Sequence, residues 1–303
     1  MSRRHWAQCI MNKVLVVFGG NSDEKEISAL SAESVLKNIS TDYLTRKINL
    51  NDLDLNLLDD EIIFIAVHGK GGEDGHLQKS LEEKNIKFTG SRSDATKKCW
   101  NKYLSKNILN KNGIKTPDAF FYEEHKTNIN EISLSPSKKY FVKPISNGSS
   151  LGITKISNIN QLEDSIKLAQ RFSNNVIIEE AYEDAEYTVA ILNDKPLAPL
   201  EIKVNVPSGY YDYEAKYLSS KTQKKVVSDS RLIQKLKALA IDAYLAHGCS
   251  GWGRVDIVSR GEEHAVIEIN TVPGFTEKSL FPFAAMQDGI SYPDLISTII
   301  RSI

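Results

Sequence analysis

The sequence has few cysteines and no long apolar run, and these two absences exclude several classes of protein. Its three cysteines, Cys9, Cys99 and Cys249, lie far apart in the chain and form no Cys-x-x-Cys pair. This spacing indicates neither a disulfide framework nor a zinc site, and it is typical of a protein of the reducing cytoplasm. No apolar run approaches the roughly 18 residues that a membrane-spanning helix requires, so we expect no membrane partner.

An excess of charge of either sign is also missing, because 38 Lys and Arg residues face 39 Asp and Glu residues. The formal net charge of −1 offers no positive surface for nucleic acid or anionic lipid. A composition of 41% hydrophobic and 25% charged residues is typical of a globular protein with two or three domains at this length. Residues 1–12 precede the first periodic segment, so we expect them to form a loose extension.

The stretch from Gly251 to Gly274 contains two segments in which apolar and polar residues alternate. A period of two is typical of half-buried strands, and Gly261 lies in the polar link between them, so we predict a β-hairpin. The face expected to be buried carries Val255, Ile257, Ile267 and Ile269. The opposite face carries Arg254, Asp256, Glu268 and Asn270.

The polar face of this hairpin has two interpretations. Carboxylate and carbonyl oxygens are the ligands that Mg²⁺ prefers, and the ion keeps its other positions for water and substrate phosphates. A guanidinium beside them suits an oxyanion or a phosphoryl group. The pattern therefore indicates a metal and phosphate site, but a solvated face with two ion pairs would give the same pattern.

Glycine-rich loops follow two apolar runs near the N-terminus, 14–18 and 62–67, which we predict to be buried parallel strands. In open α/β sheets, ligands bind beyond the carboxyl ends of such strands. The first loop lacks the third glycine of a dinucleotide fingerprint. The second has four glycines around His68, Glu73 and Asp74, which allows its backbone to approach a ligand closely.

Three later segments complete the prediction. A single helix is expected over 94–111, with Lys102 in its middle. The small residues of 147–152 predict a flexible hairpin loop suited to phosphate oxygens, although it is not a Walker A loop. Hydrophobic periodicity then disappears over 204–227, where tyrosines and lysines gather. A long irregular segment of this kind is typical of a lid or binding loop.

Five motifs occur in order along the chain: Gly19-Gly20-x-Ser22-x-Glu24-x-Glu26-x-Ser28, His68-Gly69-x-Gly71-Gly72-Glu73-Asp74-Gly75, Lys143-Pro144-x5-Ser150-x-Gly152, Tyr211-Asp212-Tyr213-x-Ala215-Lys216-Tyr217, and Gly251-Trp252-Gly253-Arg254-x-Asp256 with Glu268-x-Asn270-x2-Pro273-Gly274. Together they make the chain, from about Val14 to Ile300, resemble the D-alanine:D-alanine ligases of the ATP-grasp superfamily. That resemblance implies ATP-dependent joining of two D-alanines through an acyl phosphate, for peptidoglycan precursor synthesis in the cytoplasm. It also implies a homodimer.

The same resemblance implies an α/β fold with an N-terminal Rossmann-like open sheet followed by a two-domain ATP-grasp fold. The expected limits are 13–93 for an N-terminal α/β substrate domain and 94–182 for the central ATP-grasp domain. The C-terminal ATP-grasp domain is expected over 183–303, with a lid loop over 204–227.

Residue roles also follow from the resemblance. The residues expected to bind ATP are Lys102, Lys143, Ser149, Ser150, Glu179, Glu180, Glu186 and Lys216. Two Mg²⁺ ions, or Mn²⁺, are expected on Asp256, Glu268 and Asn270. The catalytic residues are expected to be Glu24, Ser149, Tyr217 and Arg254. The D-alanine pockets are expected to include Glu24, His68, Tyr217, Arg254, Gly274, Ser279 and Leu280.

Two alternatives stay open at this point. The ATP and metal residues are shared across the superfamily, so a ligase that joins another carboxylate to another amine has the same pattern. A nucleotide-binding regulator without turnover is the second alternative, because a fold does not fix a function. Such a regulator is expected to have lost a metal ligand or Arg254, and this chain has not. By the same resemblance, the tyrosine at position 217 favours a dipeptide product over an ester to D-lactate.

Overall fold

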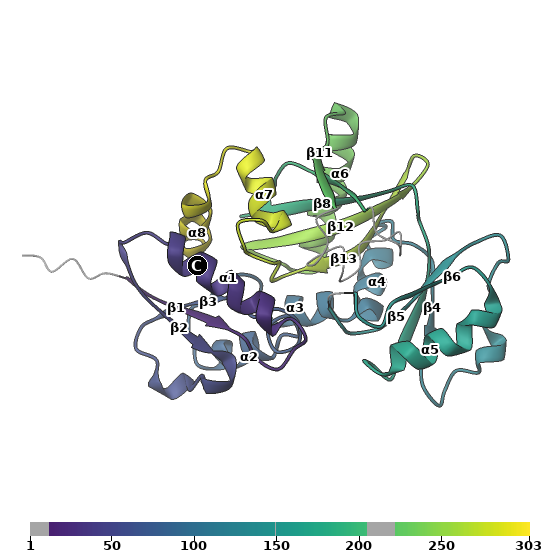
Figure 1. Ribbon diagram of the computed structural model, residues 1–303, viewed down its shortest axis with the longest axis horizontal. Helices are drawn as coiled ribbons and strands as arrows, with labels where there is room; N and C mark the ends of the chain where they lie inside the picture. The colour runs from purple at the N-terminus through teal and green to yellow at the C-terminus, as the bar shows by residue number, and fades with distance from the viewer. Residues whose placement is uncertain (1–11, 149, 205–221) are drawn as a thin grey trace, which may run out of the picture.

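Three β-sheets follow one another along the chain in the computed structural model, which describes residues 12–148, 150–204 and 222–303 (Figure 1). The first sheet is parallel with the order β2-β1-β3, and the middle sheet is antiparallel with the order β4-β7-β5-β6. The third sheet is antiparallel with the order β11-β10-β8-β12-β13, and β9 pairs with β8. The α/β class and the open N-terminal sheet are thereby confirmed.

The first sheet is the buried parallel unit that the apolar runs predicted. Its strands are β1 (Asn12–Phe18), β2 (Tyr43–Asn49) and β3 (Ile62–Ile65). Its helices are α1 (Lys25–Asn38) and α2 (His76–Glu83), with short 3-10 turns at Leu50–Asp52 and Leu55–Leu57. Side chains 14–17 of β1 are at most 1% exposed, because both faces of the strand are covered. The glycine loops after β1 and β3 therefore leave the same edge of the sheet.

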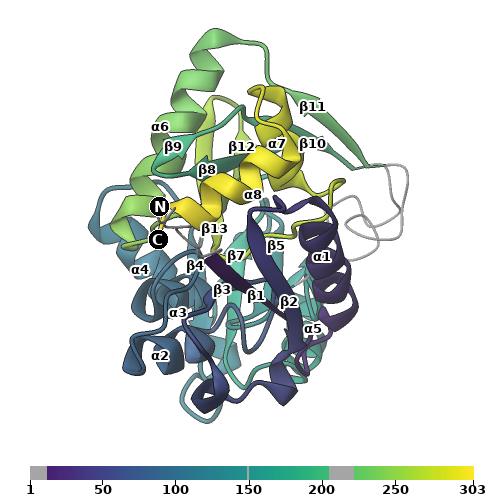
Figure 2. The same cartoon turned by 90° about the vertical axis from the view of Figure 1, so that its left-hand side faces the viewer.

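The C-terminal helices return to this first sheet. They are α7 (Leu280–Gln287) and α8 (Tyr292–Arg301), and α8 packs beside α1. A buried aromatic cluster joins them to the third sheet, with the ring centroid of Trp252 lying 5.0 Å from that of Phe275 and 5.3 Å from that of Phe281. Figure 2 shows α8 in front of the third sheet and above the strands of the first sheet. The first and last segments of the chain thus share one core.

The predicted single helix over 94–111 is wrong, because the chain forms two helices there. They are α3 (Ser93–Trp100) and α4 (Lys102–Lys111). Asn101 has an extended backbone (φ −92°, ψ 107°), and its side chain accepts a hydrogen bond from the backbone N–H of Leu104 as the N-cap of α4. Asparagine favours this capping position over a helix interior. Lys102 is therefore the first residue of a helix, and does not lie in the middle of one.

The middle sheet has a hydrophobic core of its own. Its strands are β4 (Ala119–Tyr122), β5 (Tyr140–Pro144), β6 (Thr154–Ile156) and β7 (Val176–Glu180). The helix α5 (Leu162–Gln170) packs against these strands, with 3-10 turns at Ile129–Glu131 and Ile159–Gln161. Among the buried members of this core are Val142 and Ile178, which pair across β5 and β7. The middle sheet therefore packs as a unit of its own.

The third sheet contains the predicted hairpin. Its strands are β8 (Ala185–Leu192), β9 (Lys195–Pro196), β10 (Leu200–Lys203), β11 (Gln223–Val226), β12 (Trp252–Arg260) and β13 (Glu263–Asn270). Helix α6 (Ser230–Ala246) covers it together with α3 and α4. Because residues 223–226 form the edge strand β11, which pairs with β10, the C-terminal part of the lid predicted over 204–227 is wrong. Most of that segment, 205–221, lies outside the described residues.

The domain limits 13–93, 94–182 and 183–303 stay predictions. The helices α3 and α4 contribute Ala95, Cys99 and Leu109 to the core beneath the third sheet. In the part of the chain that the structure describes, every helix is too short or too polar to cross a bilayer.

Candidate active site

A cavity of about 500 Å³ opens between the middle and third sheets. Its apolar lining comes from Phe141, Ile153, Tyr182, Ile202, Val258 and Ile267. Its charged lining includes Lys102, Lys143, Glu179, Glu180, Glu186, Asp256 and Glu268. An apolar wall combined with a few convergent charged groups is typical of a small-molecule site. These seven charged residues belong to the predicted ATP and metal sets. The cavity is also lined by five charged residues that were not predicted, namely Lys155, Glu183, Asp184, Glu201 and Lys203.

Strand register gives the cavity two ends. On β12, Asp256 lies opposite Thr188 of β8, whereas Val258 lies opposite Glu186. On β5, Lys143 lies opposite Ile177 of β7, which is three residues before Glu180. We call the part of the cavity that is lined by Lys102, Lys143, Asp256 and Glu268 the phosphate end. The hinge end is defined as the lining around residues 180–186, where β7 leads into β8.

The polar face of the hairpin is assembled as predicted. Arg254 lies opposite Asn270, and Asp256 lies opposite Glu268. Facing residues of an antiparallel pair have Cβ atoms roughly 4.5–5.5 Å apart. The two strands therefore place one guanidinium, two carboxylates and one amide on a single surface.

The apolar face differs from the prediction at one residue. Val255, Ile257 and Ile269 are buried, but Ile267 is half-buried and lines the cavity. The register shifts after Asp256, so that Ile257 pairs with Val266 and Ile267 has no partner on β12. A bulge of this kind redirects one side chain to the other face. Val266 therefore takes the core position that the simple alternation gave to Ile267.

Arg254 and Asp256 form a buried, two-pronged ion pair. The guanidinium donates from Nε to Asp256 Oδ1 at 2.8 Å and from Nη2 to Oδ2 at 2.7 Å. Thr188 Oγ1 also donates to Asp256 Oδ1, at 2.6 Å. Planar pairing at two points fixes the orientation of the guanidinium plane. The pair thus fixes the Arg254 guanidinium in place at the phosphate end.

The oxygen donors on the hairpin fit a hard divalent cation. Asp256 and Glu268 face each other across the strands, and Asn270 Oδ1 accepts from the Val272 N–H at 3.0 Å, which fixes the amide. Magnesium is usually held by one or two carboxylates, with phosphates and water completing its shell. No cluster of three or more His, Cys, Asp or Glu side chains suited to a metal occurs among the described residues. Two carboxylates, an amide and a ligand's phosphates form a donor set that needs no such cluster.

Two predicted lysines reach the phosphate end from different elements. Lys102 Nζ, at the start of α4, donates to the Asn147 carbonyl at 3.2 Å and lies 3.8 Å from Glu268 Oε2. Lys143, on β5, is buried and paired with Glu179. Both ammonium groups border a smaller cavity that Asn147, Gly148 and Ser150 also line. The loop predicted to hold phosphate oxygens therefore lies beside two cations.

Sequence reasoning missed Lys106, which completes a buried cluster with Glu179 and Lys143. Its ammonium donates to Thr116 Oγ1 at 2.7 Å and to the Pro117 carbonyl at 2.6 Å, and it lies 2.8 Å from Glu179 Oε2. Burial alone would raise the pKa of Glu179, but the two ammonium groups outweigh it and lower that pKa to about 2. The cluster, with two cations and one anion, keeps a net positive charge beside the phosphate end.

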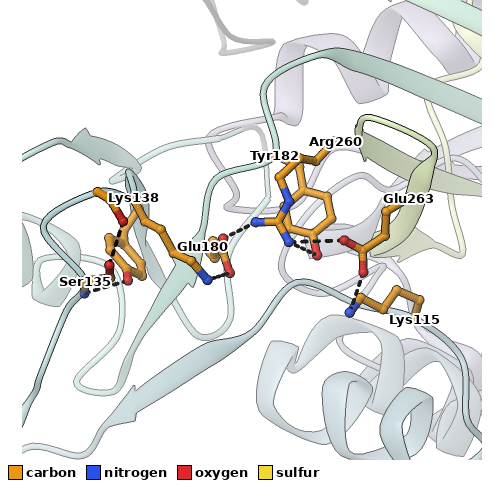
Figure 3. Close-up of polar contacts among 9 residues, drawn as sticks. Lys115, Ser135, Lys138, Glu180, Tyr182, Arg260 and Glu263 are labelled. Carbon is orange, nitrogen blue, oxygen red and sulfur yellow. Dashed lines mark hydrogen bonds and ion pairs between the residues drawn. The ribbon is translucent and has the colours of Figure 1, made fainter.

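Glu180 has different partners from its neighbour. Its carboxylate contacts Lys138 at 2.8 Å and Arg260, and Arg260 also contacts Glu263 at 3.1 Å (Figure 3). Arg260 was not predicted as a site residue. The side chain of Glu180 is thus held within the protein at the hinge end, so any direct contact with ATP stays a prediction. Glu186 lines the same end of the cavity.

Glu24 lies where loops from the first and middle sheets meet. It is 7% exposed, and a methyl group added at Gly148 would lie 2.5 Å from Glu24 Oε2. One added at Gly69 would lie 2.6 Å from the same oxygen. A side chain at either position would therefore have to displace the end of the Glu24 side chain, and the positive φ of Gly69 (+72°) independently favours glycine there. Burial and the charge of Glu24 raise the pKa of the nearby Glu73 well above its ordinary value, which favours protonation of this side chain.

His68 is buried, and both of its ring nitrogens contact the protein. Nδ1 lies 2.9 Å from the Val272 carbonyl, and Nε2 lies 2.8 Å from Ser31 Oγ. A carbonyl only accepts, so Nδ1 carries the proton and Nε2 accepts from the serine hydroxyl. Burial lowers the pKa of His68, which favours this neutral form. The ring links the loop after β3 to the loop after β13, and its contact with a substrate carboxylate stays a prediction.

The residues predicted for the second amino acid lie after β13. Ser279 Oγ accepts from the Thr276 N–H at 3.0 Å and lies 2.8 Å from Thr276 Oγ1. A methyl group at Gly274 would lie 3.2 Å from the same hydroxyl. The side chain of Leu280 is buried in the core, which leaves its backbone as the group able to meet a ligand. Three further predicted residues, Ser149, Lys216 and Tyr217, lie outside the described residues.

Comparisons with known proteins agree on one family. The family model described as "D-ala D-ala ligase C-terminus" matches residues 108–301. A D-alanine–D-alanine ligase of Pseudoalteromonas translucida (strain TAC 125) is 36% identical over 300 residues, which cover 95% of this chain and 96% of that protein.

Solved structures give the same result. A D-alanine–D-alanine ligase from Bacillus anthracis complexed with ATP matches with a TM-score of 0.85 at 28% identity, over 96% of this chain and 97% of that one. The VanG D-Ala:D-Ser ligase from Enterococcus faecalis matches with a TM-score of 0.84 at 27% identity, over 96% and 98% of the two chains.

Proposed function

The chain belongs to the D-alanine–D-alanine ligase family, and from that premise we propose that it joins two D-alanines with ATP and releases ADP and phosphate. The observation that carries this proposal is the phosphate end of the cavity. There, Lys102 and Lys143 lie near the carboxylates of Asp256 and Glu268. The guanidinium of Arg254 is paired with Asp256. This arrangement suits the charge of a transferred phosphoryl group.

The proposed reaction has two steps, and each step forms one bond and breaks another. A carboxylate oxygen of the first D-alanine attacks the γ-phosphorus of ATP, ADP leaves, and an acyl phosphate forms. The amine of the second D-alanine then attacks the carbonyl carbon, and phosphate leaves with the oxygen to which it was bound. Arg254, oriented by Asp256, supports the charge on the phosphoryl group and then on the tetrahedral oxyanion.

Other residues bind and orient the reactants in this proposal. The Glu24 carboxylate accepts the ammonium of the first D-alanine, and His68 holds the loop beside it. The ammonium groups of Lys102 and Lys143 contact ATP phosphates. Mg²⁺, held by Asp256, Glu268 and Asn270, offsets phosphate charge when bound. The Ser279 hydroxyl and the backbone at Leu280 bind the carboxylate of the second D-alanine. We also propose that the protein acts in the cytoplasm, because its substrate is ATP. We further propose a homodimer, because the resemblance implies that assembly.

The experiment that tests the function measures phosphate release from Mg²⁺-ATP by the purified protein, with products identified by mass. The amino-acid arms are D-alanine, L-alanine, D-serine with D-alanine, D-lactate with D-alanine, and none. We expect release with D-alanine and formation of its dipeptide, and Arg254→Ala should lower kcat about 100-fold or more while the protein stays folded. Release without any dipeptide, or none with D-alanine, would contradict the proposal. The D-serine arm is included because a D-Ala:D-Ser ligase is among the structural relatives.

A further inference from the structure

Arg260 makes four contacts at the outer side of the hinge end. Its Nη1 donates to Glu180, and its Nη2 donates to Tyr182 Oη and to a Glu263 oxygen, each at 3.1 Å. Its guanidinium carbon also lies 4.2 Å from the centroid of the Tyr182 ring. Figure 3 shows the guanidinium between the two glutamates, against the tyrosine. One planar group thus meets two carboxylates and the face and hydroxyl of one ring.

These contacts belong to a network that joins two sheets. Glu180, at the end of β7, also pairs with Lys138, and Glu263, at the start of β13, also pairs with Lys115 at 2.5 Å. The charges therefore alternate along the line Lys138, Glu180, Arg260, Glu263 and Lys115 (Figure 3). Alternation leaves each carboxylate with a cation on both sides. Arg260 is the member at which the middle sheet meets the hairpin of the third sheet.

The hairpin turn also binds the hinge through its backbone. The Asp184 N–H donates to the Ser259 carbonyl at 3.1 Å, and the Gly261 N–H donates to Asp184 Oδ2 at 2.6 Å. Residues 180–184 are therefore tied to the turn at both of their ends. Tyr182, between these ties, is 6% exposed and lines the cavity from its inner side. The contacts of Arg260 with Tyr182 therefore restrain a side chain that lines the cavity.

We propose that Arg260 is a positioning residue for nucleotide binding, holding Tyr182 and Glu180 so that the hinge end keeps the shape that accepts the base of ATP. This inference rests on the proposed function, because it assumes ATP in this cavity. Arg260 lies away from the phosphate end, so it sets the affinity for the base and leaves the chemical step unaffected. The occupant of the hinge end is a planar aromatic base, which suits a wall of Tyr182, Ile202, Val258 and Ile267.

An ordinary surface ion pair would have no such effect. The Arg260 side chain is 43% exposed, and exposed pairs contribute little to stability. Its two principal partners differ from that case, since Glu180 and Tyr182 are both buried and both line the cavity. A stacked guanidinium that also donates to the ring hydroxyl restrains the ring in two ways.

The test compares Arg260→Gln and Arg260→Lys with the wild type, and uses Lys167→Gln as a control. Lys167 forms an exposed ion pair with Glu163 on α5 and does not line the cavity. Binding of ADP and of inorganic tripolyphosphate, which has no base, is measured by calorimetry, together with KM for ATP and for D-alanine. Thermal unfolding of each variant is recorded in parallel.

For Arg260→Gln we expect ADP affinity and KM for ATP to worsen about tenfold, with kcat within about twofold. Tripolyphosphate binding and KM for D-alanine should not change. Arg260→Lys keeps the charge without the planar fork, so it should lie between glutamine and wild type. ADP binding by Arg260→Gln equal to wild type, or an equal loss for tripolyphosphate, would overturn the inference. If the glutamine variant fails to fold, the lysine variant gives the same two readouts. If the wild type binds neither ADP nor tripolyphosphate, the result would instead contradict the proposed function.

Discussion

Glu179 and Glu180 are adjacent on β7, and each is 3% exposed, yet their partners differ. The partners of Glu179 are Lys106 and Lys143, whose side chains are 4% and 10% exposed. The partners of Glu180 are Lys138 and Arg260, at 41% and 43%. Successive side chains of a strand point to opposite faces, so one carboxylate meets cations in the interior and the other meets cations at the surface. The exposure of the partner, and not of the carboxylate, distinguishes the two clusters.

This difference separates stability from positioning. Removing one member of a fully buried ion cluster leaves charges that water cannot reach, which is costly. Removing an exposed cation lets water take its place, so the fold loses little. We therefore expect the Glu179 cluster to support folding and the net charge at the phosphate end. The Glu180 cluster is expected to affect mainly the shape of the hinge end.

The largest effect is expected for Glu179→Gln. The variant leaves Lys106 and Lys143 close together in the interior without a counter-charge, which should lower the free energy of unfolding by about 3–5 kcal/mol. Urea unfolding followed by circular dichroism measures this change. The matched control is Glu163→Gln on the surface of α5, and a loss no larger than that of the control would remove the distinction between the clusters.

A smaller loss is expected for Lys106→Met. Glu179 keeps Lys143 as a partner, so the free energy of unfolding should fall by about 2 kcal/mol through the lost hydrogen bonds to a charged group. Glu179 then keeps Lys143 but loses its second cation, and KM for ATP should rise because less positive charge remains at the phosphate end. Unfolding and steady-state kinetics measured on the same preparation test both parts. An unchanged KM would show that Lys106 supports folding alone.

The Glu179 cluster should also make the free energy of unfolding depend on pH in acid. The folded-state pKa of Glu179 is lowered from 4.5 to about 2, so its contribution is fully present above about pH 4.5 and is lost as pH falls toward 2. The free energy of unfolding of the wild type should therefore decrease across that window, and Glu179→Gln should show a flatter curve there. Urea titrations at several pH values between 2 and 6 measure both slopes. Parallel curves for the two proteins would mean that Glu179 does not carry this pH dependence.

The smallest effect is expected for Lys138→Gln. Its exposed ammonium is one of two cations on Glu180, so the free energy of unfolding should change by less than about 1 kcal/mol. The difference from wild type should shrink further in about 1 M salt, where exposed charges are screened. Unfolding at low and high salt checks this expectation. A loss as large as that of Lys106→Met would show that the surface cluster is as important to folding as the buried one.

Local patterns in the sequence were enough to predict the polar face of the hairpin. Alternation with period two placed Arg254, Asp256, Glu268 and Asn270 together, and the register confirms it. The same alternation failed at Ile267, because a bulge adds one residue to β13 and no residue type marks it. The break at Asn101 carries a signal that was available, since asparagine favours a helix N-cap.

Contacts between distant segments were beyond local patterns. Lys106 was not predicted as a site residue, and only the folded chain brings it from α4 to Glu179 on β7. Arg260 and Glu180 are 80 residues apart, and Cys99 and Cys249, with sulfur atoms 3.4 Å apart, are separated by 150. Nothing in one sequence reports such pairs, because each depends on how separate elements pack. The predicted roles of Ser149, Lys216 and Tyr217 lie outside the described residues and stay predictions.

In the proposed reaction, ATP activates a carboxylate in this cavity before the amide bond forms. The most direct measurement uses D-alanine labelled in its carboxylate with a heavy oxygen isotope, and follows the label by mass spectrometry of the released phosphate. If both carboxylate oxygens are labelled, attack of the carboxylate on ATP followed by displacement of phosphate predicts one labelled oxygen in each phosphate. The dipeptide then keeps three of the four labelled oxygens of the two D-alanines. Unlabelled phosphate, released together with dipeptide, would contradict this reaction.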